Sequence, residues 1–365
     1  MSQVIFILLF GLPFIVFPWG ISPFETPKVF VAEMILALLL IQQILFQPKF
    51  IRVSRDWLYP IGLIFGLSLL HVVFLHTPTT IFGNVFRLQG VFLLWLLLGW
   101  VLTIANSNLL NIKSQWVWIA FSGLLISVFL FGWEENGRWI GSLGEPNALA
   151  ATAIFFWPWL SLAEIKVKNN LSTFLPPTFT FIIILFSGSR SGIVAFILQL
   201  LFLLFFKFTK SFKKSFSWII ILLIFGLTLP FWETKIFENR VEIWQTALSA
   251  GWKNPILGHG FGNIEQALKQ TAINLSNNLR FQYVDSSHNF LLDWWVQGGM
   301  VGLGALIYLL NRTVRNFIKK QARLELVLLI GVVTVMLFNP VSVVTLVHFW
   351  WLIGWGAVQT DLKVV

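Results

Sequence analysis

Long apolar runs, separated by short polar segments, follow one another along the whole chain. Runs such as 6–20 (FILLFGLPFIVFPWG) and 219–232 (IIILLIFGLTLPFW) contain no charged residue. A helix needs about 20 mostly apolar residues to cross a bilayer. The pattern predicts an all-α, polytopic integral membrane bundle, a single domain over residues 1–365 with ten to twelve spans. Their approximate positions are 4–24, 28–46, 57–76, 88–105, 115–133, 147–163, 171–187, 191–206, 217–232, 289–311, 325–341 and 343–358.

Composition agrees with this pattern. The 365 residues are 57% hydrophobic and 11% charged, whereas soluble domains carry about 25% charged residues. No positively charged segment precedes the first run, so we expect a span there and not a cleaved signal. The chain has no cysteine, and its five histidines lack the spacing of metal ligands. We attribute the net charge of +10 to membrane topology and expect no nucleic-acid partner.

The charged residues divide the loops into two unequal faces. When both termini are placed on one face, that face holds 16 Lys and Arg against 4 acids, and the other holds 9 of each. Cytoplasmic loops carry the excess of Lys and Arg, so both termini are predicted to be cytoplasmic. The opposite face then holds the one long loop, residues 233–288.

This long loop contains two short segments with helical patterns, which predict interfacial helices. The first has an apolar stripe that is typical of a helix on the membrane surface, formed by Val241, Trp244, Leu248 and Trp252. The glycine-rich turn GHGFG (258–262) precedes the second, where Asn263 and Gln266 have capping-box spacing. Such a turn can present N–H groups to an anion, although a plain turn explains it better.

Several arginines lie in or beside turns on the same face. A guanidinium group offers a planar fork of donors that matches phosphate oxygens. Each arginine also has a structural explanation, either snorkelling at a span end or, for Arg240, an interfacial position stacked on Trp244. The candidates are Arg190 in SGSRSG, Arg240 at the start of the first loop helix, Arg138 in GRWIGSLGEPNALA, and Arg87 in FRLQG.

His288 stands in the segment DSSHNFLLDWW, with Asn289 beside it, immediately before a predicted span. Imidazole titrates near physiological pH, with an ordinary pKa of about 6.5, and can take a proton from a hydroxyl. A histidine at a span end can also be a simple helix cap, and no Ser-His-Asp spacing accompanies it. The residues alone leave both explanations open.

Taken together and in order, these segments resemble the bacterial O-antigen ligase and polymerase superfamily. The resemblance covers residues 137–305 and rests on GSLGEPNALA, SGSRSG, NRVEIWQTALSAGWKNPILGHGFGNIE and SHNFLLDWWVQGGMVGLGAL. It implies a multi-pass glycosyltransferase of the bacterial inner membrane that needs no metal ion or other cofactor. Such enzymes move a glycan from undecaprenyl diphosphate to an acceptor hydroxyl at the periplasmic face, in polysaccharide and lipopolysaccharide biosynthesis.

The resemblance also implies roles for individual residues. Arg190 and Arg240 would bind the donor diphosphate, and His288 would be the catalytic base. The secondary candidates are Arg138, Asn289, Arg87 and Trp244. The implied partners are a lipid-diphosphate-linked glycan, a glycan, lipid or protein acceptor, and membrane lipids. The periplasmic loop of 56 residues leaves little room for an elaborate acceptor-binding domain, so the choice between ligase and polymerase stays open.

Two other functions remain open at this stage. Arginines on the outer face could bind a small anion, such as bicarbonate, for transport. Transporters often show internal repeats and broken helices near the membrane centre, whereas this chain shows no repeat and its cations lie at span ends. A non-catalytic scaffold or flippase partner is the third alternative. We expect the enzyme.

Overall fold

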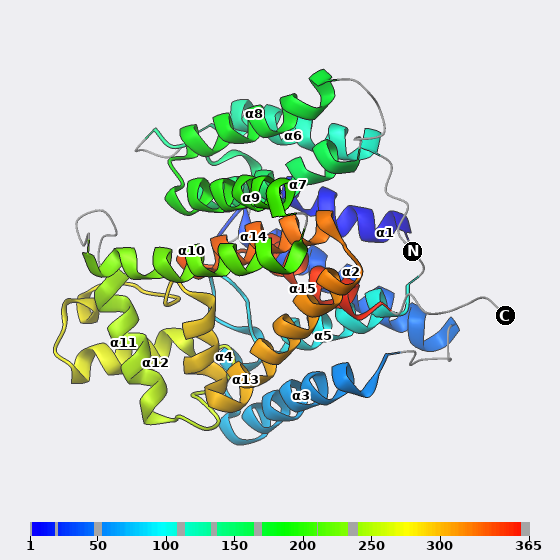
Figure 1. Ribbon diagram of the computed structural model, residues 1–365. Coiled ribbons are helices and arrows are strands. Elements are labelled where there is room, and N and C mark those ends of the chain that lie inside the picture. The colour runs from blue at the N-terminus through cyan, green and yellow to red at the C-terminus, as the bar shows by residue number, and fades with distance from the viewer. Residues whose placement is uncertain are drawn as a thin grey trace.

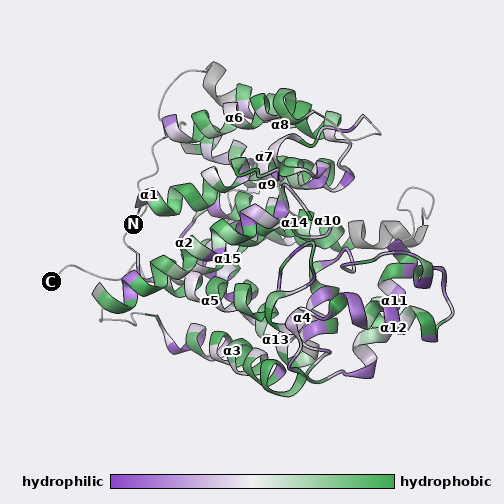
Figure 2. Ribbon diagram, turned by 180° about the vertical axis from the view of Figure 1, so that it is seen from behind, coloured by the Kyte–Doolittle hydropathy of each residue, from purple (hydrophilic) through white to green (hydrophobic). Residues whose placement is uncertain are grey.

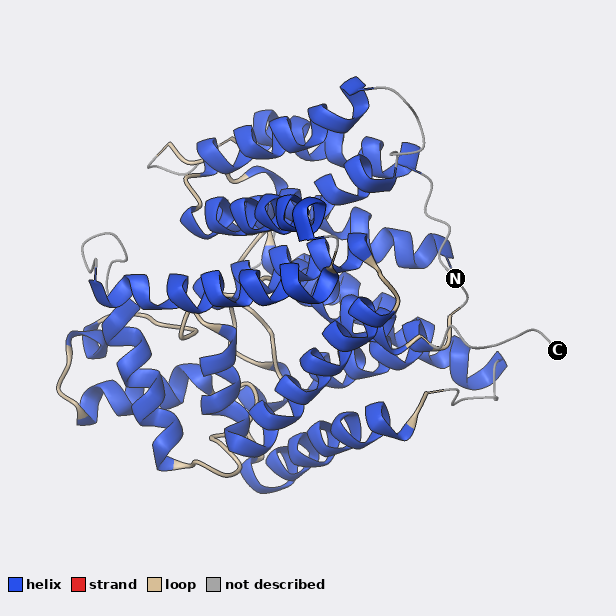
Figure 3. Cartoon of the chain, viewed as in Figure 1, coloured by secondary structure: helices blue, strands red, loops and turns tan. Residues whose placement is uncertain are grey.

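In the computed structural model the chain forms a bundle of helices (Figure 1). The structure describes residues 2–18, 21–46, 53–107, 114–132, 137–163, 170–209, 211–232 and 240–358, and no β-strand occurs in these ranges (Figure 3). The long helices are α2 (Glu25–Phe46), α3 (Arg55–Leu75), α5 (Val91–Ala105), α6 (Ser114–Phe131), α7 (Pro146–Ala163), α8 (Asn170–Ser187), α9 (Arg190–Thr209), α10 (Phe212–Trp232), α13 (Phe290–Lys319), α14 (Arg323–Phe338) and α15 (Val343–Ala357). The shorter ones are α1 (Ser2–Phe6), α4 (Pro78–Phe82), α11 (Arg240–Lys253) and α12 (Ile264–Asn274), with single turns η1 (Ile7–Gly11), η2 (Leu12–Phe14), η3 (Gly141–Leu143) and η4 (Asn278–Phe281).

Every predicted span overlaps helical structure in the described residues, although residues 15–18 of the first run lie outside any helix. Among the described residues, five helices are long and apolar enough to cross a membrane, namely α2, α3, α6, α9 and α13. The all-α membrane bundle is therefore confirmed, while the number of spans stays a prediction. The first run is irregular: α1 continues into a π turn and a 3-10 turn that contains Pro13, because proline lacks the N–H of a regular helix.

Helices α14 and α15 lie at the centre of the bundle. Helix α14 packs against α7, α9, α13 and α15, and α15 also packs against α5. Nearly all of their side chains are buried, as expected for helices that are apolar on every side. Outer helices instead expose large apolar side chains, such as Phe74 and Phe129, at 76% and 78%. These positions match a lipid-facing surface.

Two short polar helices mark one end of the bundle, here called the polar end. Helices α11 and α12 lie at this end, opposite the start of α1 (Figure 1), and both contain many hydrophilic residues (Figure 2). Helix α11 packs on α12 and α13. Its apolar stripe is split, because Trp244 is buried at 4% exposure whereas Leu248 and Trp252 are exposed.

A break in helix α13 joins this polar end to the bundle. Gly299 has φ +58° and ψ −159°, which interrupts the helix. The freed N–H of Met300 donates to the Pro255 carbonyl at 2.8 Å, and the N–H of His259 donates to the Val296 carbonyl at 2.8 Å. The GHGFG turn is therefore a structural contact with α13, as the plain-turn explanation expected.

We predict that Gly299→Ala destabilises the protein by about 2–3 kcal/mol, because a side chain at positive φ is strained. An added Cβ would also lie 2.4 Å from the Ile256 carbonyl oxygen. Gly304→Ala in the same helix is the matched control, since its Cβ would meet no atom within 4 Å. Thermal unfolding in detergent measures both, and equal melting temperatures for the two variants would contradict the prediction.

Candidate active site

One cavity at the polar end of the bundle brings together His288 and all four predicted arginines. Its volume is about 590 Å³. The other lining residues are Glu145, Pro146, Asn147, Gly188, Ser191, Asp285, Asn339 and Pro340. A smaller apolar hollow of about 290 Å³ between α10, α13 and α14 contains no charged side chain. Of these two, only the first, here called the arginine cavity, has side chains that can bind an anion and accept a proton.

Four helices begin at this cavity. Pro146 is the first residue of α7, Arg190 of α9 and Arg240 of α11. His288 immediately precedes the N-cap residue of α13. The N-terminus of a helix carries a partial positive charge and free N–H groups, and it favours anions. The arginine charges and the helix dipoles therefore act in the same direction.

Arg190 and Arg138 lie on either side of the turn between α8 and α9. The Nε of Arg138 donates to the Ser187 carbonyl at 2.8 Å. The side chain of Arg190 is exposed and makes no hydrogen bond or ion pair with the described residues. Ser189 closes the turn, because its Oγ donates to Asn147 Oδ1 at 2.8 Å and accepts from the N–H of Gly192 at 3.2 Å. Arg190 is therefore positioned by its backbone, and its guanidinium is available to a ligand.

Arg240 lies against the end of α14. Its guanidinium donates to the carbonyl of Phe338, the last residue of that helix, and to Asn339 Oδ1 at 3.4 Å. The Nδ2 of Asn339 in turn donates to Ser191 Oγ in α9. The C-terminus of a helix is partially negative, so α14 stabilises the charge of Arg240 and connects it to the start of α9.

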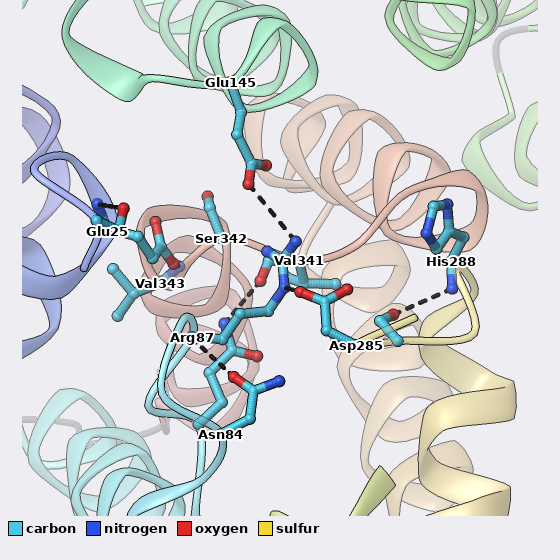
Figure 4. Close-up of polar contacts among 12 residues, drawn as sticks. Glu25, Asn84, Arg87, Glu145, Asp285, His288, Val341, Ser342 and Val343 are labelled. Carbon is cyan, nitrogen blue, oxygen red and sulfur yellow. Dashed lines mark hydrogen bonds and ion pairs between the residues drawn. The ribbon is translucent and has the colours of Figure 1, made fainter. Parts of the chain in front are cut away.

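Arg87 differs because two carboxylates hold it. Its Nε donates to Asp285 Oδ2 at 2.6 Å, and an Nη lies 3.5 Å from Glu145 Oε1 (Figure 4). Its own N–H donates to Asn84 Oδ1 at 2.8 Å. Burial alone would lower the pKa of Arg87, but the nearby carboxylates, Glu145 and Asp285 above all, outweigh burial and raise that pKa. Arg87 therefore connects the loop before α5 to the start of α7 and to the loop that carries His288.

His288 lies in a left-handed backbone conformation, with φ +58°. Its backbone N–H donates to Ser286 Oγ at 3.0 Å (Figure 4). The residue lines the cavity. Burial, with smaller effects from Arg240 and Arg87, lowers the pKa of His288 to about 4, although Asp285 opposes the shift. The ring is therefore neutral near pH 7, and a neutral imidazole nitrogen accepts a proton.

Residues 178–307 match the family model of the O-antigen ligase. A curated relative, the ComP-specific O-oligosaccharyltransferase of Acinetobacter baylyi, is 28% identical over 283 residues, covering 66% of this chain and 50% of the relative. The resemblance to the O-antigen ligase superfamily is confirmed. The chain spans about half the length of the curated relative that it matches.

The O-antigen ligase match contains some of the cavity residues but not all. Arg190, Arg240 and His288 lie inside it, whereas Arg87 and Arg138 precede it. The two comparisons support a membrane protein of a glycan-transferring ligase family. Among the described residues, no group of three or more His, Asp or Glu side chains is arranged to hold a metal ion.

Two secondary candidates lie outside the cavity lining. Asn289 is the N-cap of α13, because its Oδ1 accepts from the N–H groups of Leu291 and Leu292 at 3.0 and 3.2 Å. Trp244 is buried in an apolar cluster with Leu279 and Phe338. The helix cap is therefore Asn289 and not His288, and Trp244 contributes to packing.

The expected capping box of α12 is wrong. The side chain of Asn263 makes no capping hydrogen bond. It accepts instead from Thr79 Oγ1 at 2.8 Å and donates to Thr80 Oγ1 at 2.8 Å. A contact with α4, far away in the sequence, has replaced the local cap.

A buried carboxylate fixes the loop that carries His288. Asp293, in the first turn of α13, accepts from Ser286 Oγ at 2.9 Å and from the N–H of Ser287 at 2.7 Å. The hydroxyl of Ser287 also donates to Asp293 and contacts Asn289. Ser286 thus connects Asp293 to the N–H of His288. One feature of the sequence indicates this arrangement, namely an acid inside an apolar run, which is uncommon in membrane segments.

We predict that Asp293→Asn lowers the free energy of unfolding by about 2 kcal/mol, because the amide keeps one acceptor oxygen for Ser287, loses the negative charge that strengthens these hydrogen bonds, and no longer accepts from the Ser286 hydroxyl. Asp56→Asn is the matched control. Its carboxylate pairs with Arg312 but is 49% exposed, and exposed ion pairs contribute only about 0–1 kcal/mol. Thermal melting of both purified variants tests this, and an unchanged melting temperature for Asp293→Asn would refute the role of the carboxylate.

Proposed function

We propose that this protein is a membrane glycosyltransferase that moves a glycan from a lipid diphosphate, of the undecaprenyl type, to an acceptor hydroxyl. The observation that carries the proposal is the cavity in which arginines and four helix N-termini surround a neutral histidine. A cationic site without a base would only bind an anion. A base beside a cationic site can also activate an acceptor while the anion leaves.

The donor diphosphate would bind between the turn of Arg190 and the guanidinium of Arg240. Both arginines belong to segments that meet at Asn339 and Ser191, so they form one unit of the cavity wall. A diphosphate gains negative charge as the bond to the anomeric carbon breaks, and fixed arginines and helix N-termini stabilise that charge. Arg138, on the other side of the same turn, is placed to support Arg190.

His288 would take the proton from the acceptor. As the acceptor oxygen attacks the anomeric carbon, the bond from that carbon to the diphosphate oxygen breaks. The lipid diphosphate leaves with the electron pair, and the hydroxyl proton passes to the imidazole. A pKa near 4 makes His288 a weak base in the empty cavity. Burial is the main cause of this low pKa and would persist in the complex, but a bound diphosphate would offset the smaller effect of the arginines and so would raise the pKa.

The distribution of charge supports one orientation in the membrane. Lys and Arg are in excess on the face opposite the cavity, which supports an inner-membrane protein with cytoplasmic termini and the cavity on the periplasmic side. The curated relative is named as an O-oligosaccharyltransferase specific for ComP. The acceptor of this chain would be a glycan, a lipid or a protein.

The direct test is release of lipid diphosphate when purified protein is incubated with a lipid-diphosphate-linked glycan and an acceptor. We predict that Arg190→Lys and Arg240→Lys each lose about tenfold or more of this activity, because lysine cannot offer the planar fork. Arg315→Lys, at an exposed position far along α13, is the matched control. Absence of release by the wild-type protein would refute glycan transfer and leave anion transport, and full activity of either lysine variant would refute its role in the fork.

A second prediction concerns His288 and pH. His288→Ala and His288→Gln should both slow transfer by about 10²–10⁴-fold, because neither side chain can take the proton. In the wild type, kcat/KM reports the free enzyme and should show no limb from His288 above about pH 5, since the pKa is lowered to about 4. The value of kcat reports the bound complex. Because the diphosphate raises the pKa of His288, kcat should fall as the pH is lowered, and this fall should begin at a higher pH than the fall of kcat/KM. Near-normal activity of His288→Gln with an unchanged profile would contradict the role as base.

A further inference from the structure

A second hollow lies beside the loop that carries His288. It has a volume of about 250 Å³ and lies between α12 and residues 279–284, which include most of η4 and the segment after it. Five apolar side chains contribute to its lining, namely Leu268, Ala272, Leu279, Phe281 and Val284. Ligand sites generally combine apolar lining with a few convergent polar groups, and the remaining lining of this hollow supplies such groups.

The polar side chains of the hollow offer both donors and acceptors. Lys269 and Arg280 donate, Glu265 accepts, and Gln282 can do both. The hydroxyl of Tyr283 donates to Glu265 Oε2 at 3.1 Å. A ligand that matches this set must itself carry many groups that donate and accept, together with an apolar face. A sugar ring has this chemistry, because its hydroxyls do both and its C–H faces are apolar.

Exposed aromatic rings lie at the same place. Phe281 is 79% exposed and Tyr283 is 57% exposed. The ring of Phe86 lies 5.3 Å from that of Tyr283, and the guanidinium of Arg280 lies 4.5 Å from the ring of Phe281. Exposed clusters of large apolar groups usually mark an interaction site. The charged groups among them disfavour insertion into the lipid hydrocarbon.

The hollow and the arginine cavity are lined by neighbouring residues of one segment. Tyr283 lines the hollow, and Asp285, two residues later, lines the cavity beside His288. Two residues of extended chain span at most about 7 Å. We propose that this hollow binds a sugar of the transferred glycan beyond the sugar that reacts. The proposal rests on the glycan transfer proposed above and assigns to Tyr283 and Glu265 the recognition of glycan length.

The test compares two donors, a lipid diphosphate carrying a single sugar and one carrying an oligosaccharide. Tyr283→Ala should raise the KM for the oligosaccharide donor by roughly three- to tenfold, the range expected when one aromatic contact is lost. Its kcat/KM for the single-sugar donor should stay within about twofold, because that donor does not reach the hollow. Glu265→Gln should act in the same direction, since it removes an anionic acceptor.

Two further variants separate recognition from folding. Tyr283→Phe keeps the ring and should keep most of the preference for the longer donor, even if Tyr283→Ala expresses poorly. Tyr59→Ala, which removes another exposed tyrosine at 70% exposure in α3, should leave both KM values unchanged. Equal effects of Tyr283→Ala on both donors, or none on either, would overturn the sugar site. Failure of the wild type to transfer from either donor would instead overturn the proposed function.

Discussion

The concentration of positive charge around one cavity is the constraint that organises the polar end of this protein. Four arginines line the cavity, and four helices start there. Like charges in a partly buried site repel one another and lose solvation, so the surrounding structure must stabilise them. Arg87 is stabilised by Asp285 and Glu145, and Arg240 by the end of α14. Arg190 makes no comparable contact with the described residues, so its charge is the one that an anionic ligand would satisfy most directly.

The position of His288 depends on two carboxylates that act from different directions. Asp293 holds the serines before it from within α13, and Asp285 connects the same loop to Arg87. A site that only bound an anion would need the arginines but not a histidine held in a left-handed conformation beside them. This geometry, together with the family match, favours group transfer over anion uptake.

The sequence predicted the helices well because one physical requirement dominates them. A segment buried in lipid or at the centre of the bundle must be apolar, so the described apolar runs form helices except in the irregular first run, and α14 and α15 form the core. Arg190, Arg240 and His288 were found from their residue types in turns and from the family resemblance. The partners of Arg87 could not be found this way, because they lie 58 and 198 residues away in the sequence. The prediction that Asn263 caps α12 was wrong for the same reason, since a contact with the distant helix α4 replaces the local capping hydrogen bond.

The cavity is lined in part by residues outside the segment that resembles the O-antigen ligase. Residues 178–307 contain Arg190, Arg240, Asp285 and His288. Without Arg87, however, Asp285 would lose its ion pair, and without Asn339 the start of α9 would lose its connection to Arg240. The charges that tune His288 therefore come from both inside and outside the matched segment. It follows that relatives which share that segment can differ in the pKa of the histidine, and hence in the pH at which they act, through residues that lie outside the common motif.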